Sequence, residues 1–478
     1  MMLYDTATVA APVVDTVQAL AMTGDLAMGQ PPGHSPRTAH LAALVAEADG
    51  AGLDGIATAR LVALLRWSGS TANAAGFAAL LGDDVAGRRA MLDRTLPAGH
   101  RLTPANALPL ARVHCEVAGD IARMLALPAG VEDGLRHLFE HANGNGLPAR
   151  LRGDDIPGVV RHVALAGDLE ILSRAHGIDT ALRLVGRLAG RKYPARLVEC
   201  IVPHARGWLD ASDGAAGVPP ATGGAVPLAL VADVLELKLP WLAGYSRRVA
   251  GLARAAADLA GLPAAQQQCL ARAALLHGVG RAAIPNRVWN HAGKLRQAEL
   301  EQVRRVPYWS ARMATRVPGL AGEAHLASHA YERLDGSGCY RGLVHEALAP
   351  PHRILAAAAA WAALVAPRPW RAPYAPAAAA ALLAAQAGRF DRHAVEAVIA
   401  AARTGPAQPQ AGPPSSPLSD READVLRRVS TGAGHAETAR ALRISTGAVR
   451  AHLHGIFDKL GCATRPAATL KALTLGLI

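Results

Sequence analysis

The sequence predicts a mainly α-helical protein of several domains. Hydrophobic residues make up 51% of the 478-residue chain and aromatic residues only 4%, with Ala and Leu dominating the apolar set. Small, unbranched aliphatic side chains favour helix over strand. The chain is too long for one ordinary core, so we expect about three domains.

Two stretches rich in Pro, Gly, Ala and Ser interrupt the helical pattern, at residues 205–227 and 403–417. Such stretches offer little apolar surface to bury, so we interpret both as linkers. They divide the chain into domains at residues 25–205, 228–402 and 418–478.

The first two domains repeat several short motifs in the same order. The matched pairs are GHSPR (33–37) with GYSRR (244–248), ALLRWSG (63–69) with ALLHGVG (274–280), and FEHANGNG (139–146) with YERLDGSG (331–338). The first two pairs are 211 positions apart and the third is 192 apart, as is Arg161 from Arg353. Constant offsets across several matches indicate a tandem repeat.

The second copy carries three longer motifs in a recognisable order. These are AALLHGVGRAAIPNRVWNHAGKL, HAYERLDGSGCYRGL and RILAAAAAWAALVAPRPWR. Over residues 228–402 the chain resembles the HD-GYP family, helical metal-dependent phosphodiesterases that hydrolyse cyclic di-GMP; residues 33–200 resemble it more faintly. The resemblance implies His and Asp side chains that converge on two or three metal ions, which activate a bridging water.

Most of the family's ligand positions hold other residues in the second copy. The first His falls on Tyr245, the His-Asp pair on His277 and Gly278, the following Lys on Arg281, the next His on Val306, the paired His on Ala330 and Tyr331, and the last Asp on Ala359. The GYP triplet falls on Gly338, Cys339 and Tyr340, and His329 lies one place from the paired His. His277 alone cannot hold a catalytic metal.

The first copy keeps His34 and His114 at ligand positions, and Asp168 lies one place from the last Asp. Its His-Asp pair falls on Arg66 and Trp67. A guanidinium cannot lose its proton or ligate a metal. We therefore expect two degenerate HD-type domains without catalytic residues, bound metal or cofactor.

Simpler roles compete with a remnant site. His277 fits a hydrogen-bonded core histidine, His34 a helix entrance, and His114 and Asp168 surface or capping positions. Residues 332–338 fit a structural turn. One hypothesis is that Arg66 replaces metal charge and that the first copy binds an anionic small molecule or a nucleotide; the alternative is that both copies only dimerise or dock a partner.

The C-terminal segment, residues 418–478, predicts four short helices. Ser419 and Glu422 form a capping box before an apolar stripe, and glycines at 432 and 434 end that helix. The third helix has Val449, Leu453, Ile456 and Leu460 at helical spacing, which predicts a buried face. Ser445 is suited to cap this helix and Thr464 to cap the fourth.

The opposite face of the third helix carries small residues and hydrogen-bond donors. Gly447, Ala451 and Asp458 fall there with Arg450 and His454. Small residues let a helix enter the major groove, and Arg450 can reach a guanine edge or a phosphate. Two short helices, a tight turn and a longer helix with a polar outward face form a helix-turn-helix pattern.

The whole segment resembles the LuxR-type helix-turn-helix family. The matching stretches are LSDREADVL, ETARALRIS, AVRAHLHGIFDKLG and Thr464-Arg465. The resemblance implies that the third helix reads DNA and that the fourth helps the protein dimerise on DNA. The family often has a Lys or polar residue followed by Thr where this chain has Gly447-Ala448, so fewer side chains reach the bases. The expected DNA-binding residues are Thr438, Arg443, Ser445, Thr446, Gly447, Arg450, His454 and Lys459.

Charge agrees with a polyanionic partner. The chain carries +12 with a pI of about 10, and residues 418–478 hold nine Lys and Arg against five Asp and Glu, a balance of +4. Five scattered cysteines without a CxxC pair, no apolar run of membrane-spanning length and no signal-peptide pattern predict a cytoplasmic protein.

We therefore expect a transcription regulator that binds double-stranded DNA as a homodimer. An active metallophosphodiesterase with an attached DNA-binding domain and a protein-interaction scaffold are the alternatives.

Overall fold

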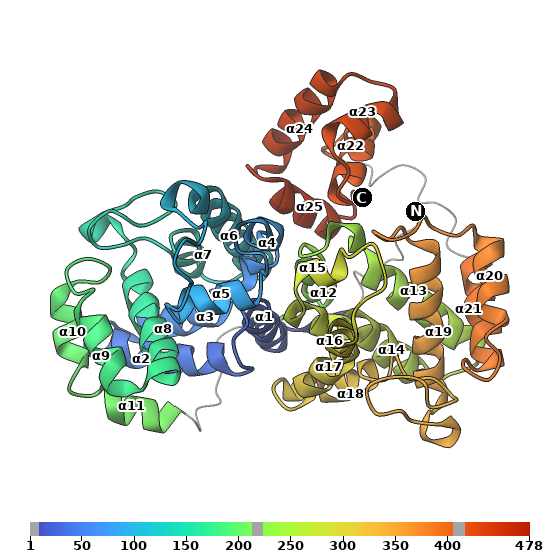
Figure 1. Cartoon of the computed structure of the whole chain (residues 1–478), viewed down its shortest axis with the longest axis horizontal. Coiled ribbons are helices and arrows are strands. Elements are labelled where there is room, and N and C mark those ends of the chain that lie inside the picture. Colours follow the sequence, from blue (N-terminus) through green and yellow to red (C-terminus); the bar gives the residue numbers. More distant parts are fainter. Residues whose placement is uncertain (1–8, 213–222, 405–415) are drawn as a thin grey trace. The chain divides into compact units, whose positions relative to one another are not determined.

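The computed structural model describes residues 9–212, 223–404 and 416–478 (Figure 1). Regular structure in these residues is helical except for one two-stranded sheet, in which β1 (Ala10–Pro12) pairs with β2 (Ala225–Pro227). The all-α prediction is confirmed. No helix in the described ranges combines the length and apolar character that a membrane span requires. Contacts divide the chain into two compact units, Pro12–Gly224 and the remainder.

The unit at 12–224 is built around three helices, because α2 packs against both α3 and α8. Its helices are α1 (Val13–Ala27), α2 (His34–Ala48), α3 (Leu53–Leu65), α4 (Ala74–Leu81), α5 (Ala86–Leu92), α6 (Pro104–Met124), α7 (Ala129–Arg136), α8 (Gly158–His176), α9 (Ile178–Gly186), α10 (Ala195–Ile201) and α11 (Ala205–Ser212). Ala and Leu side chains fill the interior between the central helices.

The other unit repeats this plan, with α13 packed against α14, α19 and α21. Its helices before the C-terminal segment are α12 (Ala229–Glu236), α13 (Tyr245–Leu259), α14 (Ala264–Leu276), α15 (Asn286–Trp289), α16 (Gln297–Arg304), α17 (Val306–Ala314), α18 (Ala321–Ala327), α19 (Pro350–Val365), α20 (Pro376–Ala384) and α21 (Arg392–Thr404). The C-terminal segment contributes α22 (Asp420–Ser430), α23 (His435–Leu442), α24 (Thr446–Leu460) and α25 (Arg465–Thr474).

The two offsets found in the sequence recur in the helix boundaries. Helices α2 and α13 both span 15 residues and start 211 positions apart, and α3 and α14 both span 13 residues with the same offset. Helices α8 and α19 start 192 positions apart. The repeat is therefore structural as well as sequential.

A close backbone approach is also repeated. A Cβ added to Gly69 would lie 2.2 Å from the carbonyl oxygen of His114, and one added to Gly280 would lie 2.1 Å from that of Val306. Each glycine lets the turn after a central helix, α3 or α14, press against a helix further along the chain, α6 or α17.

The turn at 139–146 recurs at 331–338. Glu140 accepts hydrogen bonds from the backbone N–H groups of residues 149, 150 and 151. Glu332 accepts them from residues 341 and 343, which lie at the 192 offset from 149 and 151. The interpretation of residues 332–338 as a structural turn fits these bonds.

Helical structure extends beyond the expected domain boundaries. Helix α1 starts at Val13 rather than near residue 25, because its VVDTVQALAM sequence buries nearly every side chain. Helix α11 occupies the first eight residues of the expected linker at 205–227, where Trp208 stacks on His204. Residues 213–222, and most of the expected linker at 403–417, lie outside the described residues.

The close approach at the two repeated glycines generates a prediction. Gly280→Ala should lower the free energy of unfolding by about 1–3 kcal/mol, because the added methyl meets a backbone carbonyl that cannot rotate away. Gly322→Ala, in a helix with no atom within 4 Å of the added methyl, should be neutral or stabilise by up to about 1 kcal/mol. Urea unfolding followed by circular dichroism measures both changes in unfolding free energy. Equal effects of the two substitutions would contradict the close backbone approach at Gly280.

Candidate functional sites

Helix α24 buries one face in the C-terminal core and leaves the other in solvent. Val449, Leu453 and Ile456 are buried, as their spacing predicts. Leu460 is partly buried at the edge of the same core. Packing therefore fixes which face of α24 is available to a partner.

Local hydrogen bonds set the ends of these helices. The Ser419 hydroxyl accepts from the Glu422 backbone N–H while the Glu422 carboxylate accepts from the Ser419 N–H at 2.8 Å, which confirms the predicted capping box. Ser445 caps α24 by accepting from the Ala448 N–H at 3.0 Å. Between α23 and α24, Arg443 adopts the left-handed region with φ of 54°, which makes the connecting turn tight.

The outward face of α24 is open and carries Arg450 together with His454, which lies 3.8 Å from the carboxylate of Asp458. Thr446, Gly447, Arg450 and His454 are exposed there. No ion pair ties Arg450 within the described ranges, and its side chain lines a shallow groove with His435, His454, Phe457 and Arg465. This face can therefore receive the edge of a polyanion.

Two residues of the expected DNA-binding set have other surroundings. Thr438 is fully buried, so its side chain packs inside the domain and cannot touch DNA. Lys459 forms an ion pair with Glu422 at 2.7 Å, which ties α24 to the start of α22. Lys459 is half-exposed, so it could contact a phosphate, but it would have to leave Glu422 to do so.

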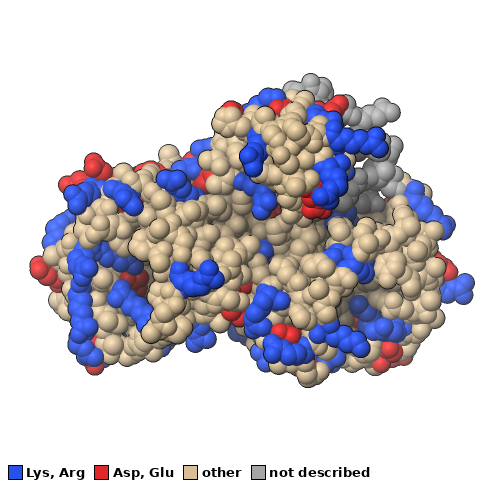
Figure 2. All heavy atoms as spheres, turned by 45° about the horizontal axis from the view of Figure 1, so that its top comes forward, with Lys and Arg blue, Asp and Glu red and all other residues tan. Residues whose placement is uncertain are grey.

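Exposed arginines give the domain its positive charge (Figure 2). Within the described residues, Arg427 pairs with Asp424 and Lys459 with Glu422. The exposed arginines of the domain are Arg421, Arg428, Arg440, Arg443, Arg450 and Arg465. A cationic surface of this kind releases counterions from a nucleic-acid backbone.

In the unit at 12–224, His34 and Arg66 meet in the interior. The His34 Nδ1–H donates to Glu170 at 2.5 Å, and the Arg66 guanidinium donates to His34 Nε2. Burial lowers the pKa of His34 and lowers that of Arg66 to about 10, so Arg66 stays a cation at neutral pH. Both nitrogens of His34 are thereby occupied, and neither is free to ligate a metal.

The carboxylates around this pair are held by other groups. Arg37 contacts Glu170 at 2.7 Å, and Arg174 contacts it at 3.4 Å. Burial alone would raise the pKa of Glu170, but its contacts with His34, Arg174 and Arg37 hold that pKa well below its usual range. Asp25 accepts from the backbone N–H and hydroxyl of Ser35, and burial raises its pKa.

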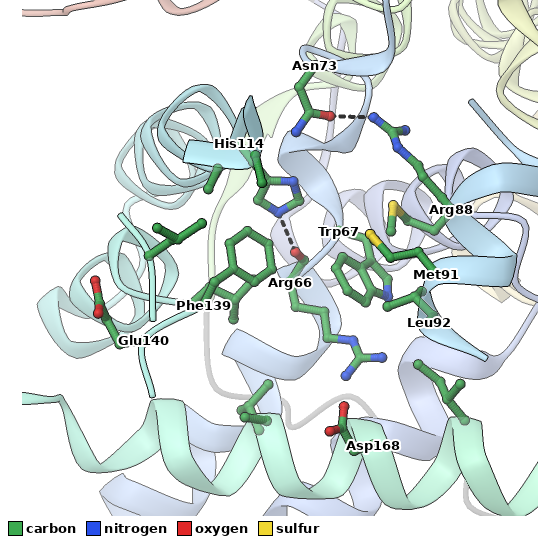
Figure 3. A pocket seen from close by; sticks show the side chains of 18 of the residues that line it. Arg66, Trp67, Asn73, Arg88, Met91, Leu92, His114, Phe139, Glu140 and Asp168 are labelled. Atoms are coloured by element: carbon green, nitrogen blue, oxygen red, sulfur yellow. Dashed lines mark hydrogen bonds between the residues drawn. The ribbon is translucent and has the colours of Figure 1, made fainter. Parts of the chain in front are cut away.

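His114 is buried and Asp168 is partly exposed, and both have fixed hydrogen-bond partners. The His114 Nε2–H donates to the backbone carbonyl of Arg66 at 2.7 Å (Figure 3), and burial lowers the pKa of His114 to about 4. Asp168 accepts from Lys192 at 2.7 Å and from the Tyr193 hydroxyl. Burial would raise the pKa of Asp168, but these partners outweigh it, so the pKa lies below its usual range.

In the second copy, His277 also meets a guanidinium. Its Nδ1–H donates to the Ala274 carbonyl at 2.5 Å, and Arg281 approaches its Nε2 at 3.3 Å. Arg281 donates to the Tyr331 hydroxyl at 2.6 Å. Burial lowers the pKa of His277 to about 3, with Arg281 adding to the shift. These contacts fit the simpler role predicted for His277, that of a hydrogen-bonded histidine in the core.

Other second-copy ligand positions have no ligand chemistry. Tyr245, at the first His position, donates its hydroxyl to the carbonyl of Ala359, at the last Asp position. His329 does not join His277: its ring stacks on His352 at 4.1 Å, and its Nδ1 bonds the His325 carbonyl. The two histidines of the predicted remnant site in the second copy, His277 and His329, therefore lie in different places.

In each copy a guanidinium fills the space beside a lost carboxylate. A Cβ added to Gly167, at the last Asp position of the first copy, would lie 1.7 Å from Arg66 Nη1. A Cβ added to Gly278, at the Asp of the His-Asp pair, would lie 2.4 Å from Arg281 Nη1. Within the described residues no three His, Cys, Asp or Glu side chains are placed to hold a metal ion. The residues present do not fit the metal centre that the HD-GYP resemblance implies.

Sequence reasoning missed the residues that hold Arg66 in place. Glu170 and Gly167 were not singled out, because their contacts join helices far apart in the chain. The available signal was a second carboxylate two residues after Asp168 on an apolar helix. Arg281 was noted as a replaced Lys, but its contact with His277 was not foreseen.

Together the helical units and the helix-turn-helix segment define a multidomain all-α protein. Family models match residues 229–394 as "HD domain" and residues 416–472 as "Bacterial regulatory proteins, luxR family". The chain therefore contains an HD domain followed by a LuxR-family DNA-binding domain.

Two curated relatives are similar to parts of the chain. A "3'3'-cGAMP-specific phosphodiesterase 3" of Vibrio cholerae serotype O1 is 30% identical over 283 residues, which cover 56% of this chain and 61% of that protein. The "Cyclic di-GMP phosphodiesterase response regulator RpfG" of Xanthomonas campestris pv. campestris is 32% identical over 175 residues, 36% of this chain and 46% of that protein. The chain thus spans less than two thirds of either relative.

A solved structure shares the fold. The crystal structure of a cyclic GMP-AMP specific phosphodiesterase of V. cholerae, V-cGAP3, superposes with a TM-score of 0.60 and 23% identity, and covers 83% of this chain and 99% of that chain. The matched 83% of this chain is longer than either compact unit, so the match includes residues of both units.

The buried His277 generates a pH prediction. An exposed histidine titrates near pH ~6.5, whereas the pKa of His277 is about 3. The unfolded chain therefore binds a proton that the native chain resists. The contribution of His277 to stability is present above pH ~6.5 and is lost as the pH falls toward about 3.

Between pH 6.5 and 5, the wild type should lose about 2 kcal/mol more unfolding free energy than His277→Gln. Glu236, whose pKa burial raises to about 7, acts in the opposite direction and cancels in the comparison. Urea unfolding across this pH range provides the measurement, with the exposed His291→Gln as the matched control. Parallel curves for wild type and His277→Gln would show that His277 titrates freely.

Proposed function

We propose that the chain is a transcription regulator that binds double-stranded DNA through α24, and that its two HD-type units sense or dimerise rather than catalyse. The observation that carries the proposal is the exposed face of α24 in a LuxR-family domain, where Arg450 forms no ion pair with any residue that the structure describes. An arginine on such a face contacts a guanine edge or a phosphate.

The rest of the proposed contact set follows from exposure. Arg450 and His454 face outward along α24, and Ser445, Thr446 and Gly447 form its start. Backbone N–H groups at a helix start bind phosphate, and Arg443 in the preceding turn adds positive charge. Thr438 is left out of this set because it is buried.

The assignment of the HD-type units to sensing or dimerisation rests on what replaces the metal ligands. Arg66 and Arg281 put guanidinium groups where a metal-dependent centre needs anionic or neutral donors. In this proposal a ligand or a second protomer changes how the C-terminal domains are presented. Two recognition helices in a homodimer would fit two half-sites on DNA.

A metal-dependent phosphodiesterase acting on cyclic di-GMP, fused to a DNA-binding domain, is the second candidate. The relatives support it, because they are named as phosphodiesterases of 3'3'-cGAMP and cyclic di-GMP. The loss of ligand chemistry at Tyr245, Gly278 and Ala359 speaks against it. Catalysis by this chain would require ligands outside the positions that the family uses.

The DNA-binding proposal predicts the effect of one substitution. Arg450→Ala should weaken binding to the chain's own promoter by about 1–3 kcal/mol if Arg450 makes a bidentate base contact. Arg316→Ala, which removes an equal charge from an exposed site outside the C-terminal domain, should leave affinity unchanged. Fluorescence anisotropy with labelled promoter DNA provides both values, and wild-type affinity for Arg450→Ala would remove Arg450 from the interface.

A second comparison tests the whole domain. The full-length chain should bind genomic fragments with an affinity that falls as salt rises, because basic side chains release counterions. A chain ending at Pro417 should lose this binding. Failure of the full-length chain, together with binding by residues 418–478 alone, would point to a missing effector. Failure of both would favour the scaffold alternative.

A further inference from the structure

The unit at 12–224 contains a cavity of about 230 Å³ directly beside the guanidinium of Arg66 (Figure 3). Its wall is mostly apolar and includes Met28, Phe77, Met91, Leu92, Phe139 and Ile171. Small-molecule sites of proteins share this character, an apolar wall with a few placed polar groups, and usually measure ~300–1,000 Å³. The size of this cavity therefore points to a small ligand.

Three buried donors in the wall lack acceptors among the described residues. They are the Nε atoms of Arg66 and Arg88 and the indole Nε1 of Trp67. Arg66 is 4% exposed and Arg88 is fully buried. A buried donor without an acceptor is costly, so an acceptor supplied by a ligand would be bound favourably.

Arg66 also lacks a carboxylate partner in the part of the chain that the structure describes. Its guanidinium donates to His34 and stacks on the ring of Trp67, whose centre lies 4.5 Å from the guanidinium carbon. The nearby acids are already engaged: Asp168 with Lys192, Glu170 with His34 and Arg37, and Asp25 with Ser35. Arg66 therefore carries a buried positive charge without an ion-pair partner, at the wall of an apolar cavity.

We propose that this cavity binds a small, largely apolar organic acid. The carboxylate takes the donors of Arg66 and Trp67, which lie close together because the guanidinium stacks over the indole. The apolar body lies against Met91, Leu92 and Phe139. A charge-assisted pair with a guanidinium is among the stronger hydrogen bonds available in a protein.

The geometry favours this class over a cyclic dinucleotide. Two purines and two phosphates exceed a cavity of about 230 Å³. Of the cations in its wall, Lys192 is already paired with Asp168, so two phosphates would have only Arg66 and Arg88 as partners. Arg88 is partly engaged already, because it donates to Asn73 and to the Ala27 carbonyl. One carboxylate would suffice for Arg66, which no described carboxylate contacts directly.

Calorimetry with the full-length chain, without DNA, tests the proposal. The probes are benzoate, phenylacetate and a series of straight-chain fatty acids, each paired with its neutral amide. At least one acid should bind one-to-one, and its amide should bind about tenfold or more weakly, because the amide lacks the charge that Arg66 recognises. Inorganic phosphate and cyclic di-GMP, added at the same concentrations, should give no heat.

Two variants locate the site. Arg66→Met should remove the preference for acid over amide, and Ala111→Phe, which fills the cavity from α6, should abolish binding of both. Arg316→Met is the control and should bind as wild type does. The comparison of acid with amide uses only the wild type, so it stands even if a variant fails to fold.

No heat from any acid at millimolar concentration, equal affinity for acid and amide, or unchanged binding by Arg66→Met would each overturn the proposal. Tight binding of cyclic di-GMP in its place would overturn it in favour of a nucleotide. The proposed function is needed only for the idea that this ligand regulates DNA binding; the binding itself does not depend on it. Because binding is measured without DNA, a failure here is distinct from a failure of DNA binding.

Discussion

A buried guanidinium that donates to a histidine organises each of the two repeated helical bodies. Arg66 with His34, and Arg281 with His277, stand among the positions that align with the metal ligands of HD-GYP phosphodiesterases. Burying such a charge without compensation costs several kcal/mol, so the surrounding residues must offset it. An aromatic ring, a histidine lone pair and the absence of a Cβ at Gly167 or Gly278 supply that environment.

The two copies reach this arrangement from different positions. Arg66 occupies the place of the His in the His-Asp pair, whereas Arg281 lies at the following Lys and points back toward its His. In both, a guanidinium of the protein itself donates to a histidine nitrogen, so that nitrogen is not free to ligate a metal ion. This arrangement supports the proposal that the helical units bind or dimerise rather than catalyse.

Local signals made much of the fold predictable. The capping box at Ser419 and the spacing of Val449, Leu453 and Ile456 involve neighbours in sequence, and the structure confirms them. The burial of Thr438 was missed because a helix of two turns gives too short a period to assign its faces. The Glu170 partner of His34 was missed because it lies 136 residues away, and no local pattern encodes that distance.

The claim that these HD-type units have exchanged metal for arginine is tested most directly by metal content and hydrolysis measured together. The full-length protein would be incubated with Mn²⁺ or Fe²⁺, separated from free metal by gel filtration and analysed for bound metal. Cleavage of cyclic di-GMP and 3'3'-cGAMP would be followed in parallel, with an active phosphodiesterase of the family as positive control. We expect no stoichiometric metal and no hydrolysis above the blank. Metal-dependent hydrolysis by the wild-type chain would contradict it.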